Sequence, residues 1–270
     1  MLEENVLLFD GAACQLGVDE AGRGPVAGPM VYGCAFSPIT QADALGALGF
    51  ADSKQLTEQQ RDDLFDTIKE SSIVGYITHS LSANELSTKM LRKLKYNLNS
   101  ISHDTCAGLI RRAVSAGVNV REVYVDTVGD PERYQEKLQG IFPLIKITVS
   151  KKADSLYPIV SAASICAKVT RDFHVKQIPD HSGVPVGSGY PGDQRTIDWL
   201  KAGFDPVFAF PDTVRFSWST VDEMIAKQSG VDFDWHEEDA EAKGQPTVTS
   251  FFAHRSRSKL FSNRCLKLVN

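Results

Sequence analysis

The sequence predicts an α/β protein in which helices flank a central sheet, with a smaller helical extension toward the C-terminus. Short apolar runs rich in β-branched residues alternate along the chain with helical patterns, which is typical of an α/β fold. The 270 residues are 42% hydrophobic and 23% charged, the composition of an ordinary globular protein with a sizeable core. These observations exclude a disordered, fibrous or disulfide-stapled chain.

Five apolar runs predict the strands of the sheet. They lie at residues 15–18, 29–36, 73–79, 120–125 and 144–149. Helical spacing predicts one helix over residues 57–70, one or two more within 86–116, and a long one that begins at Tyr157. Because this last segment opens with a proline and is rich in small residues, we expect it to pack closely on the sheet.

The chain divides into three predicted parts. Prolines and glycines between Pro179 and Gly192 mark the end of the main layer. We expect a main domain over residues 1–185 and a helical extension over residues 186–230. The last part, residues 231–270, carries a block of six acids and then a block of five bases, which is typical of a solvated, flexible tail.

Charge and cysteine content narrow the class of partner and the compartment. With 29 basic and 34 acidic residues the formal net charge is −5, so a nucleic acid would need a local basic surface. The five cysteines form no CxxC pair, which argues against a zinc site and a disulfide framework. No uncharged run is long enough to span a membrane. We expect a soluble protein of a reducing intracellular compartment, without a membrane partner.

Four acids follow predicted strands and are the first chemical signal. Asp19 and Glu20 end a strand just before a glycine-rich turn, Asp126 ends another strand, and Asp154 follows a third. Strand ends in an α/β sheet share a rim, so these carboxylates can converge there. Carboxylates with few His or Cys neighbours suit hard cations such as Mg²⁺ or Mn²⁺.

Each acid also has a structural interpretation. Asp126 could begin a turn, Asp154 could cap the next helix, and Asp19 with Glu20 could be surface charges beside a turn. A dinucleotide-binding loop is set aside, because the glycines after Glu20 do not match GxGxxG and two prolines interrupt a helix there. Taken singly, Asp126 and Asp154 favour the structural interpretation.

Six sequence blocks decide between these interpretations by their joint order. They are DEAGRGPVAGPMVYG at 19–33, DSKQLTEQQRDDL at 52–64, YNLNSISHD at 96–104, YVDTVGDPERYQEKL at 124–138, KKADSLYPIVSAASICAKVTRD at 151–172 and GSGYPGD at 187–193. With FPDTVRFSWST at 210–220, they resemble the type 2 ribonuclease H family over roughly residues 15–220. The resemblance is closest to the catalytic A chain of the eukaryotic branch. It implies a ribonuclease H-like mixed sheet flanked by helices, with a helical C-terminal extension that completes the substrate site.

The resemblance implies an endoribonuclease. Such a hydrolase cuts the RNA strand of RNA/DNA hybrids and cleaves 5′ of single ribonucleotides in duplex DNA, and so serves ribonucleotide excision and Okazaki primer removal in the nucleus. Asp19, Glu20, Asp126 and Asp154 match the family's catalytic acids, which hold two divalent ions, Mg²⁺ or Mn²⁺, with Asp19 as the expected bridge. Products would carry 5′-phosphate and 3′-OH ends.

The eukaryotic resemblance also implies two accessory subunits in a heterotrimer. Two other functions stay open. Another two-metal nuclease of the same superfold would cut DNA without a 2′-OH, and a catalytically silent subunit would only bind RNA/DNA hybrids. The presence of all four acids counts against silence.

A glycine-rich turn and one tyrosine are candidates for ribonucleotide recognition. Gly22, Arg23 and Gly24 match the family's GRG element, whose main-chain groups can hydrogen-bond the 2′-OH without a side chain in the way. Tyr190 matches the family's tyrosine that packs on the sugar beside the ribonucleotide. The structural alternatives are an ordinary turn and an ordinary packing residue.

Two further residues match positions that contact backbone phosphate in relatives. These are Lys54 and Asn97, for which a solvated surface position is nearly as good an interpretation.

The tail contains a motif outside the catalytic blocks. Gln245, Val248, Phe251 and Phe252 have the spacing Qxx(aliphatic)xxFF, which resembles the peptide that binds a sliding clamp. Exposed aromatic residues in a polar tail favour a partner that covers them, and the alternative is that they pack back on the body. In the eukaryotic family such a peptide is better known on an accessory subunit.

Overall fold

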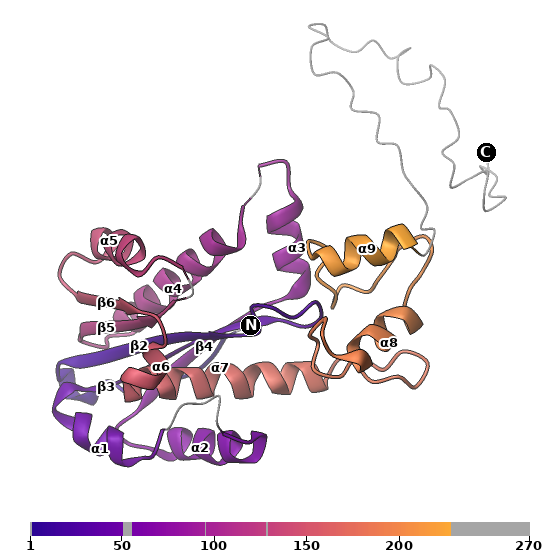
Figure 1. Ribbon diagram of the computed structural model, residues 1–270. Coiled ribbons are helices and arrows are strands. Elements are labelled where there is room, and N and C mark those ends of the chain that lie inside the picture. The colour runs from indigo at the N-terminus through magenta and orange to yellow at the C-terminus, as the bar shows by residue number, and fades with distance from the viewer. Residues whose placement is uncertain (1, 51–55, 95, 128, 228–270) are drawn as a thin grey trace, which may run out of the picture.

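A single mixed sheet forms the centre of the molecule (Figure 1). The computed structural model describes residues 2–50, 56–94, 96–127 and 129–227. Within them the sheet has six strands in the order β1-β4-β3-β2-β5-β6. The predicted α/β fold with a central mixed sheet is confirmed. The strands are β1 (Leu2–Asn5), β2 (Cys14–Ala21), β3 (Met30–Pro38), β4 (Gly75–Leu81), β5 (Val120–Asp126) and β6 (Lys146–Ser150).

The direction of the strands determines where their ends gather. Neighbours are antiparallel from β1 through β4 and β3 to β2, whereas β2, β5 and β6 run parallel. The C-terminal ends of these three parallel strands therefore meet at one edge of the sheet, where α/β proteins commonly bind ligands. All four candidate acids lie on or just after these strands.

The sequence does not predict β1, and this is a correction to the five expected strands. β1 contains Glu3 and Glu4 and pairs with β4 at the edge of the sheet. Glu4 forms a 2.8 Å ion pair with Arg112 of α4 (Leu98–Ser115). A short acidic segment lacks an apolar pattern, and only its tertiary pairing makes it a strand. The five predicted strands are all present, and β2 continues through Asp19 and Glu20.

Helices cover both faces of the sheet, and each face has its own hydrophobic core (Figure 1). One face carries α1 (Ala42–Ala47), α2 (Glu58–Glu70) and α7 (Pro158–Lys176), with the short α6 (Ala153–Leu156) just before α7. The other face carries α3 (Ala83–Leu91), α4 and α5 (Pro131–Ile141). Short 3₁₀ turns occur at η1 (Phe9–Gly11) and η2 (Ile39–Gln41).

The helices agree with the expectations from helical spacing. The predicted helix over 57–70 is α2, which begins with a capping box between Thr57 and Gln60. The segment 86–116 contains two helices, α3 and α4, and a new N-cap at Asn97 starts the second.

α7 lies against the sheet at backbone distance, as its small residues predict. A Cβ atom on Gly17 of β2 would lie 2.4 Å from the carbonyl oxygen of Ile159. A Cβ on Gly33 of β3 would lie 2.5 Å from the carbonyl oxygen of Ala163. Only glycine fits at these two positions, because any side chain would overlap the helix backbone.

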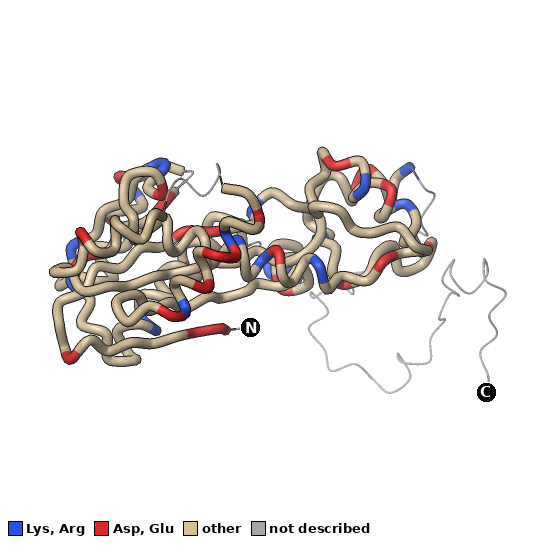
Figure 2. The backbone as a smooth tube through the Cα atoms, turned by 90° about the horizontal axis from the view of Figure 1, so that it is seen from below, with Lys and Arg blue, Asp and Glu red and all other residues tan. Residues whose placement is uncertain are grey.

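The C-terminal extension forms a second lobe beside the sheet layer (Figure 2). It contains α8 (Gln194–Ala202) and α9 (Ser219–Lys227). Its core, which includes Trp199 and Val214, also incorporates Val26 and Ala27 from the loop after β2. Ala27 and Val214 form a β-bridge, so the extension is fastened to the loop that follows Asp19 and Glu20. Among the described helices, none has the length and hydropathy needed to cross a membrane.

Candidate active site

Three of the four candidate carboxylates lie on neighbouring parallel strands. Val18 of β2 is paired with Val125 of β5, so Asp19 and Asp126 are adjacent at the next position along both strands. Glu20 follows on β2, and its backbone N–H donates a 2.7 Å hydrogen bond to Oδ1 of Asp19. The sheet therefore brings Asp19, Glu20 and Asp126 to the same edge.

Asp154 reaches this edge from α6 rather than from a strand. Its neighbour Ala153 donates a backbone N–H bond of 2.8 Å to Oδ1 of Asp126. The side chain of Asp154 is buried, and its backbone carbonyl accepts a hydrogen bond from the hydroxyl of Ser161 in α7. The turn between β6 and α7 thus links Asp154 to the end of β5.

Burial and like charge concentrate negative potential at Asp19. The side chain is only 5% exposed, and burial is the largest cause that raises its pKa well above the ordinary value. The charges of Glu20 and Asp126 raise the pKa further, against hydrogen bonds from Ser164 and from the Glu20 backbone. A cation bound near these carboxylates would offset this repulsion.

The donor set fits a hard divalent cation in its chemistry. All four candidates are carboxylates, which Mg²⁺ and Mn²⁺ prefer over nitrogen and sulfur ligands. Among the described residues, however, no three acidic, histidine or cysteine side chains are grouped so that they could hold an ion. Binding a cation would therefore require these carboxylates to turn toward one another, and Asp126 would have to share the oxygen that accepts from Ala153.

The GRG turn that follows β2 requires glycine at its first position. Gly22 has φ +79°, in the left-handed region. A Cβ atom there would lie 2.8 Å from the carbonyl oxygen of Pro29 and 2.9 Å from the side chain of Arg171. No other residue fits this turn without moving its neighbours.

A buried arginine of the extension holds the GRG turn, and the sequence gives no sign of this role. Arg215 is fully buried and donates hydrogen bonds to the carbonyl oxygens of Gly22 (2.6 Å), Gly28 (2.9 Å) and Arg23 (3.1 Å). Its burial lowers its pKa to about 9. The only signal in the sequence is a lone basic residue in the apolar run DTVRFSW.

Trp218, one turn further along the extension, fixes the next carbonyl. Its indole N–H donates a 3.1 Å bond to Gly24, and the Arg215 guanidinium lies 4.8 Å from the centre of its ring. The main-chain geometry of the turn therefore depends on a segment almost 200 residues away, since Gly24 and Trp218 are 194 positions apart.

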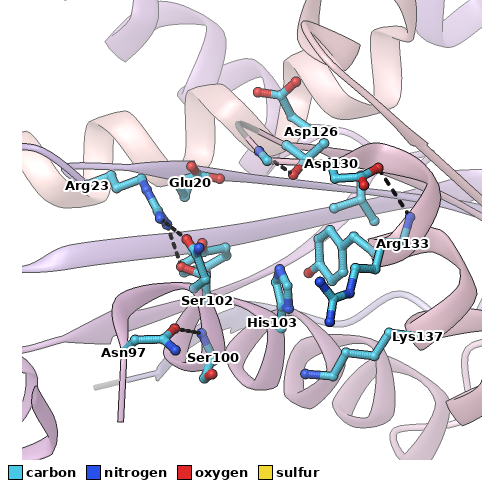
Figure 3. Close-up of a pocket in the computed structure, with 16 residues that line it drawn as sticks. Glu20, Arg23, Asn97, Ser100, Ser102, His103, Asp126, Asp130, Arg133 and Lys137 are labelled. Carbon is cyan, nitrogen blue, oxygen red and sulfur yellow. Dashed lines mark hydrogen bonds between the residues drawn. The ribbon is translucent and has the colours of Figure 1, made fainter. Parts of the chain in front are cut away.

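The side chain of Arg23 points away from the extension toward α4. Its guanidinium donates to the hydroxyl of Ser102 at 2.7 Å and to the side-chain oxygen of Asn99 at 2.5 Å (Figure 3). Arg23 thus joins the GRG turn to the first turns of α4.

Tyr190 lies beside the GRG turn, as the hypothesis of ribonucleotide recognition requires. Its ring is 43% exposed, and a Cβ on Gly24 would lie 3.4 Å from its Cε1 atom. The guanidinium of Arg171 lies 5.3 Å from the ring centre. The preceding residue, Gly189, is fixed by a 2.8 Å bond from the backbone N–H of Val26 to its carbonyl oxygen. One face of Tyr190 is therefore supported while part of the ring stays open to a ligand.

The other predicted contacts have different outcomes. Asn97 is the N-cap of α4, where its side-chain oxygen accepts a 2.9 Å bond from the Ser100 backbone, and it also lines the cavity described next. Lys54 and the predicted clamp-binding residues lie outside the described residues. These clamp-binding residues are Gln245, Val248, Phe251 and Phe252.

A cavity of about 580 Å³ opens beside the carboxylates (Figure 3). Glu20 and Asp126 line its sheet side, and His103, Arg133 and Lys137 come from α4 and α5 on its helical side. The sequence patterns do not single out these three residues, because nothing in them shows that the exposed face of α5 adjoins the strand ends.

Comparisons with known proteins give a consistent result. A family model described as Ribonuclease HII matches residues 16–221. The chain is 49% identical to the A chain of the Bos taurus ribonuclease H2 over 263 residues, 94% of this chain and 85% of that protein. It is 48% identical to the A chain of the Arabidopsis thaliana ribonuclease H2 over 236 residues, 86% of this chain and 79% of that protein.

Solved structures agree with the sequence relatives. The ribonuclease H2 of Pyrococcus horikoshii OT3 matches with a TM-score of 0.68 and 33% identity, over 79% of this chain and 98% of that one. The ribonuclease HII of Archaeoglobus fulgidus, solved in a complex with PCNA, matches with a TM-score of 0.64 and 32% identity, over 76% of this chain and 95% of that one.

Proposed function

The chain belongs to the ribonuclease HII family, and from this premise we propose that the four carboxylates at the sheet edge are its catalytic centre. The protein is a ribonuclease H, a hydrolase of the RNA strand in RNA/DNA hybrids that also removes ribonucleotides from DNA. One observation carries the proposal for the site. The family match spans Asp19, Glu20, Asp126 and Asp154, and the fold gathers these acids at the ends of neighbouring parallel strands.

We propose that the carboxylates hold two divalent ions, Mg²⁺ or Mn²⁺. Ions bound there would supply an activated water and a stabilised leaving 3′ oxygen, which gives 5′-phosphate and 3′-OH ends. Asp19 is at the centre of the set and is the proposed shared ligand, because both Glu20 and Asp126 act on its charge. The hydrogen bonds from the Glu20 backbone and from Ser164 favour the ionised form of Asp19.

We propose that the GRG turn and Tyr190 select the ribonucleotide and direct cleavage to its 5′ side. Main-chain groups at Gly22 and Gly24 carry no side chain, so a sugar can approach them closely enough to hydrogen-bond its 2′-OH. Tyr190 stands next to Gly24 with part of its ring exposed, which suits contact with the same sugar. Arg215 supports this selection indirectly, because it orients the carbonyl groups of the turn.

We also propose two kinds of protein partner. The eukaryotic relatives are named as one subunit of ribonuclease H2, which supports assembly with accessory subunits, two in the heterotrimer proposed here. The archaeal relative was solved with the sliding clamp PCNA. With the tail motif from Gln245 to Phe252, this supports clamp binding by the present chain.

Cleavage of a matched set of duplexes tests the proposal. The chain is incubated with Mg²⁺, Mn²⁺ or EDTA on duplexes that carry no ribonucleotide, one or four, and the product ends are identified. Metal-dependent cuts 5′ of the ribonucleotides, with 3′-OH ends, are expected. Cleavage of the all-DNA duplex would favour another nuclease of the superfold, and binding without cleavage would favour a silent subunit or an enzyme that needs its accessory subunits. Repeating the assay with those subunits added separates the last two.

A further inference from the structure

The helical side of the cavity beside the carboxylates carries positive charge that the proposed chemistry does not use. Arg133 and Lys137 are one turn apart on the exposed face of α5, and both line the cavity. Figure 3 shows their side chains grouped with His103 of α4, across the cavity from Glu20. Their positions leave room for a ligand between a basic helical wall and an acidic strand wall.

Little within the described residues neutralises this basic wall. Lys137 has only a long 3.6 Å ion pair with Asp104, and both side chains are largely exposed. No described acid forms an ion pair with Arg133. The nearest acid that precedes it along the chain beyond its own helix, Asp130, is used as the N-cap of α5, where it accepts from the backbone of Glu132 at 3.1 Å.

His103 reports the positive potential at this wall. Its ring is stacked on the buried ring of Tyr134, with centres 3.8 Å apart and an angle of 15° between the planes. Burial lowers the pKa of His103 to about 4, and the charges of Lys137 and Arg23 contribute. An anion in the cavity would relieve this effect, whereas a cation would strengthen it.

We propose that Arg133 and Lys137, beside His103, bind a phosphodiester of the substrate duplex next to the one that is cut. The inference rests on the proposed function, because it extends the path of the same nucleic acid from the carboxylates across the cavity to α5. The acidic strand side repels a phosphate unless metal is bound, so a basic wall opposite would hold the strand on either side of the reaction.

The test removes the two charges and measures binding of a duplex with one ribonucleotide. Arg133→Gln/Lys137→Gln is compared with Arg121→Gln/Lys146→Gln, which removes the same net charge from the opposite ends of β5 and β6. Affinity is measured by fluorescence anisotropy at about 50 to 300 mM salt, in EDTA and again with Ca²⁺. We expect the slope of log K against log salt to fall by about 1 for each phosphate that the α5 variant no longer binds, and to stay unchanged in the control.

A scan of neutral phosphates then locates the contact. Single methylphosphonates are placed along the ribonucleotide-bearing strand. At one or two adjacent positions the parent should lose affinity while the α5 variant loses none. Equal slopes for the two double variants, no position with such coupling, or no duplex binding by the parent would overturn the inference. Failure of the proposed function is seen separately, since the parent would then not cut the same duplex with Mg²⁺ or Mn²⁺, even with accessory subunits added.

Discussion

Arg215 in the C-terminal extension donates a 2.6 Å hydrogen bond to the carbonyl oxygen of Gly22, 193 residues earlier in the chain. The same guanidinium reaches the carbonyl groups of Arg23 and Gly28, so one buried side chain fixes the turn between β2 and β3. Because Asp19 and Glu20 directly precede this turn, the extension and the carboxylates are parts of one structure.

Replacing Arg215 by methionine should therefore damage both stability and selectivity. Methionine leaves three backbone carbonyl groups without their donor, and each unsatisfied buried group costs about 1 to 3 kcal/mol. We expect the free energy of unfolding, measured in urea, to fall by about 3 kcal/mol or more. Arg121→Met, on the exposed start of β5, should change it little. An Arg215→Met protein with parental stability and parental preference for ribonucleotide sites would contradict this role.

Gly22→Ala separates steric exclusion from backbone strain. Gly11 has φ +78° and no atom within 4 Å of the place that a methyl group would take, whereas Gly22 has φ +79° and meets Pro29 at 2.8 Å. Left-handed geometry costs an alanine about 1 to 2 kcal/mol at either position. Gly11→Ala should lose only that stability and keep its activity. Gly22→Ala should also lose most cleavage at single ribonucleotides, and equal activity in the two variants would show that the close contact is unimportant.

Tyr190→Ala should reduce selectivity for single ribonucleotides more than activity on long hybrids. By analogy with base–aromatic stacking, loss of the ring should cost about 1 to 3 kcal/mol, or about 5- to 150-fold in kcat/KM. Tyr190→Phe keeps the ring and should retain much of the preference. Phe208→Ala, which removes a 78% exposed ring elsewhere in the extension, is the matched control. An equal loss on both substrates would reassign Tyr190 to packing.

Asp19 should make the metal-free protein less stable as pH rises. Its pKa in the folded state is raised above the unfolded value of about 3.9, so between these two values the native state binds more protons than the unfolded state. The free energy of unfolding therefore falls as pH rises through this range. At neutral pH in EDTA, we expect Asp19→Asn to melt at a higher temperature than the parent.

Divalent ions should reverse this order. A ligand that binds only the native state raises the melting temperature with its concentration. Mg²⁺ or Mn²⁺ should therefore raise the Tm of the parent and have little effect on Asp19→Asn. A Tm of the parent that is the same in EDTA and in millimolar Mn²⁺ would count against a metal site at Asp19.

The sequence predicts those features that depend on local pattern. Five strands and the helices around them follow from hydrophobic periodicity, and Asp19 with Asp126 can be assigned to strand ends because each follows an apolar run. β1 is not predictable in this way, because an acidic edge strand carries no apolar pattern of its own.

Long-range contacts lie beyond local pattern. The role of Arg215 depends on carbonyl groups nearly 200 residues away, and the basic wall at Arg133 depends on α5 lying beside the end of β5. Resemblance assigns Asn97 to phosphate contact, and the structure adds that it caps α4. A single sequence shows neither a tertiary hydrogen bond nor the neighbour of an exposed helix face.

Single-turnover cleavage by Asp126→Asn tests the catalytic centre most directly. Asparagine keeps the size of the side chain and an oxygen for the Ala153 backbone, but removes the charge. Asp130→Asn is the control, because it lies in the same cavity and asparagine is an equally good N-cap. On a duplex with one ribonucleotide, Asp126→Asn should bind like the parent and fail to cut, while Asp130→Asn cuts normally. Near-parental cleavage by a well-folded Asp126→Asn protein would contradict a catalytic centre at this edge of the sheet.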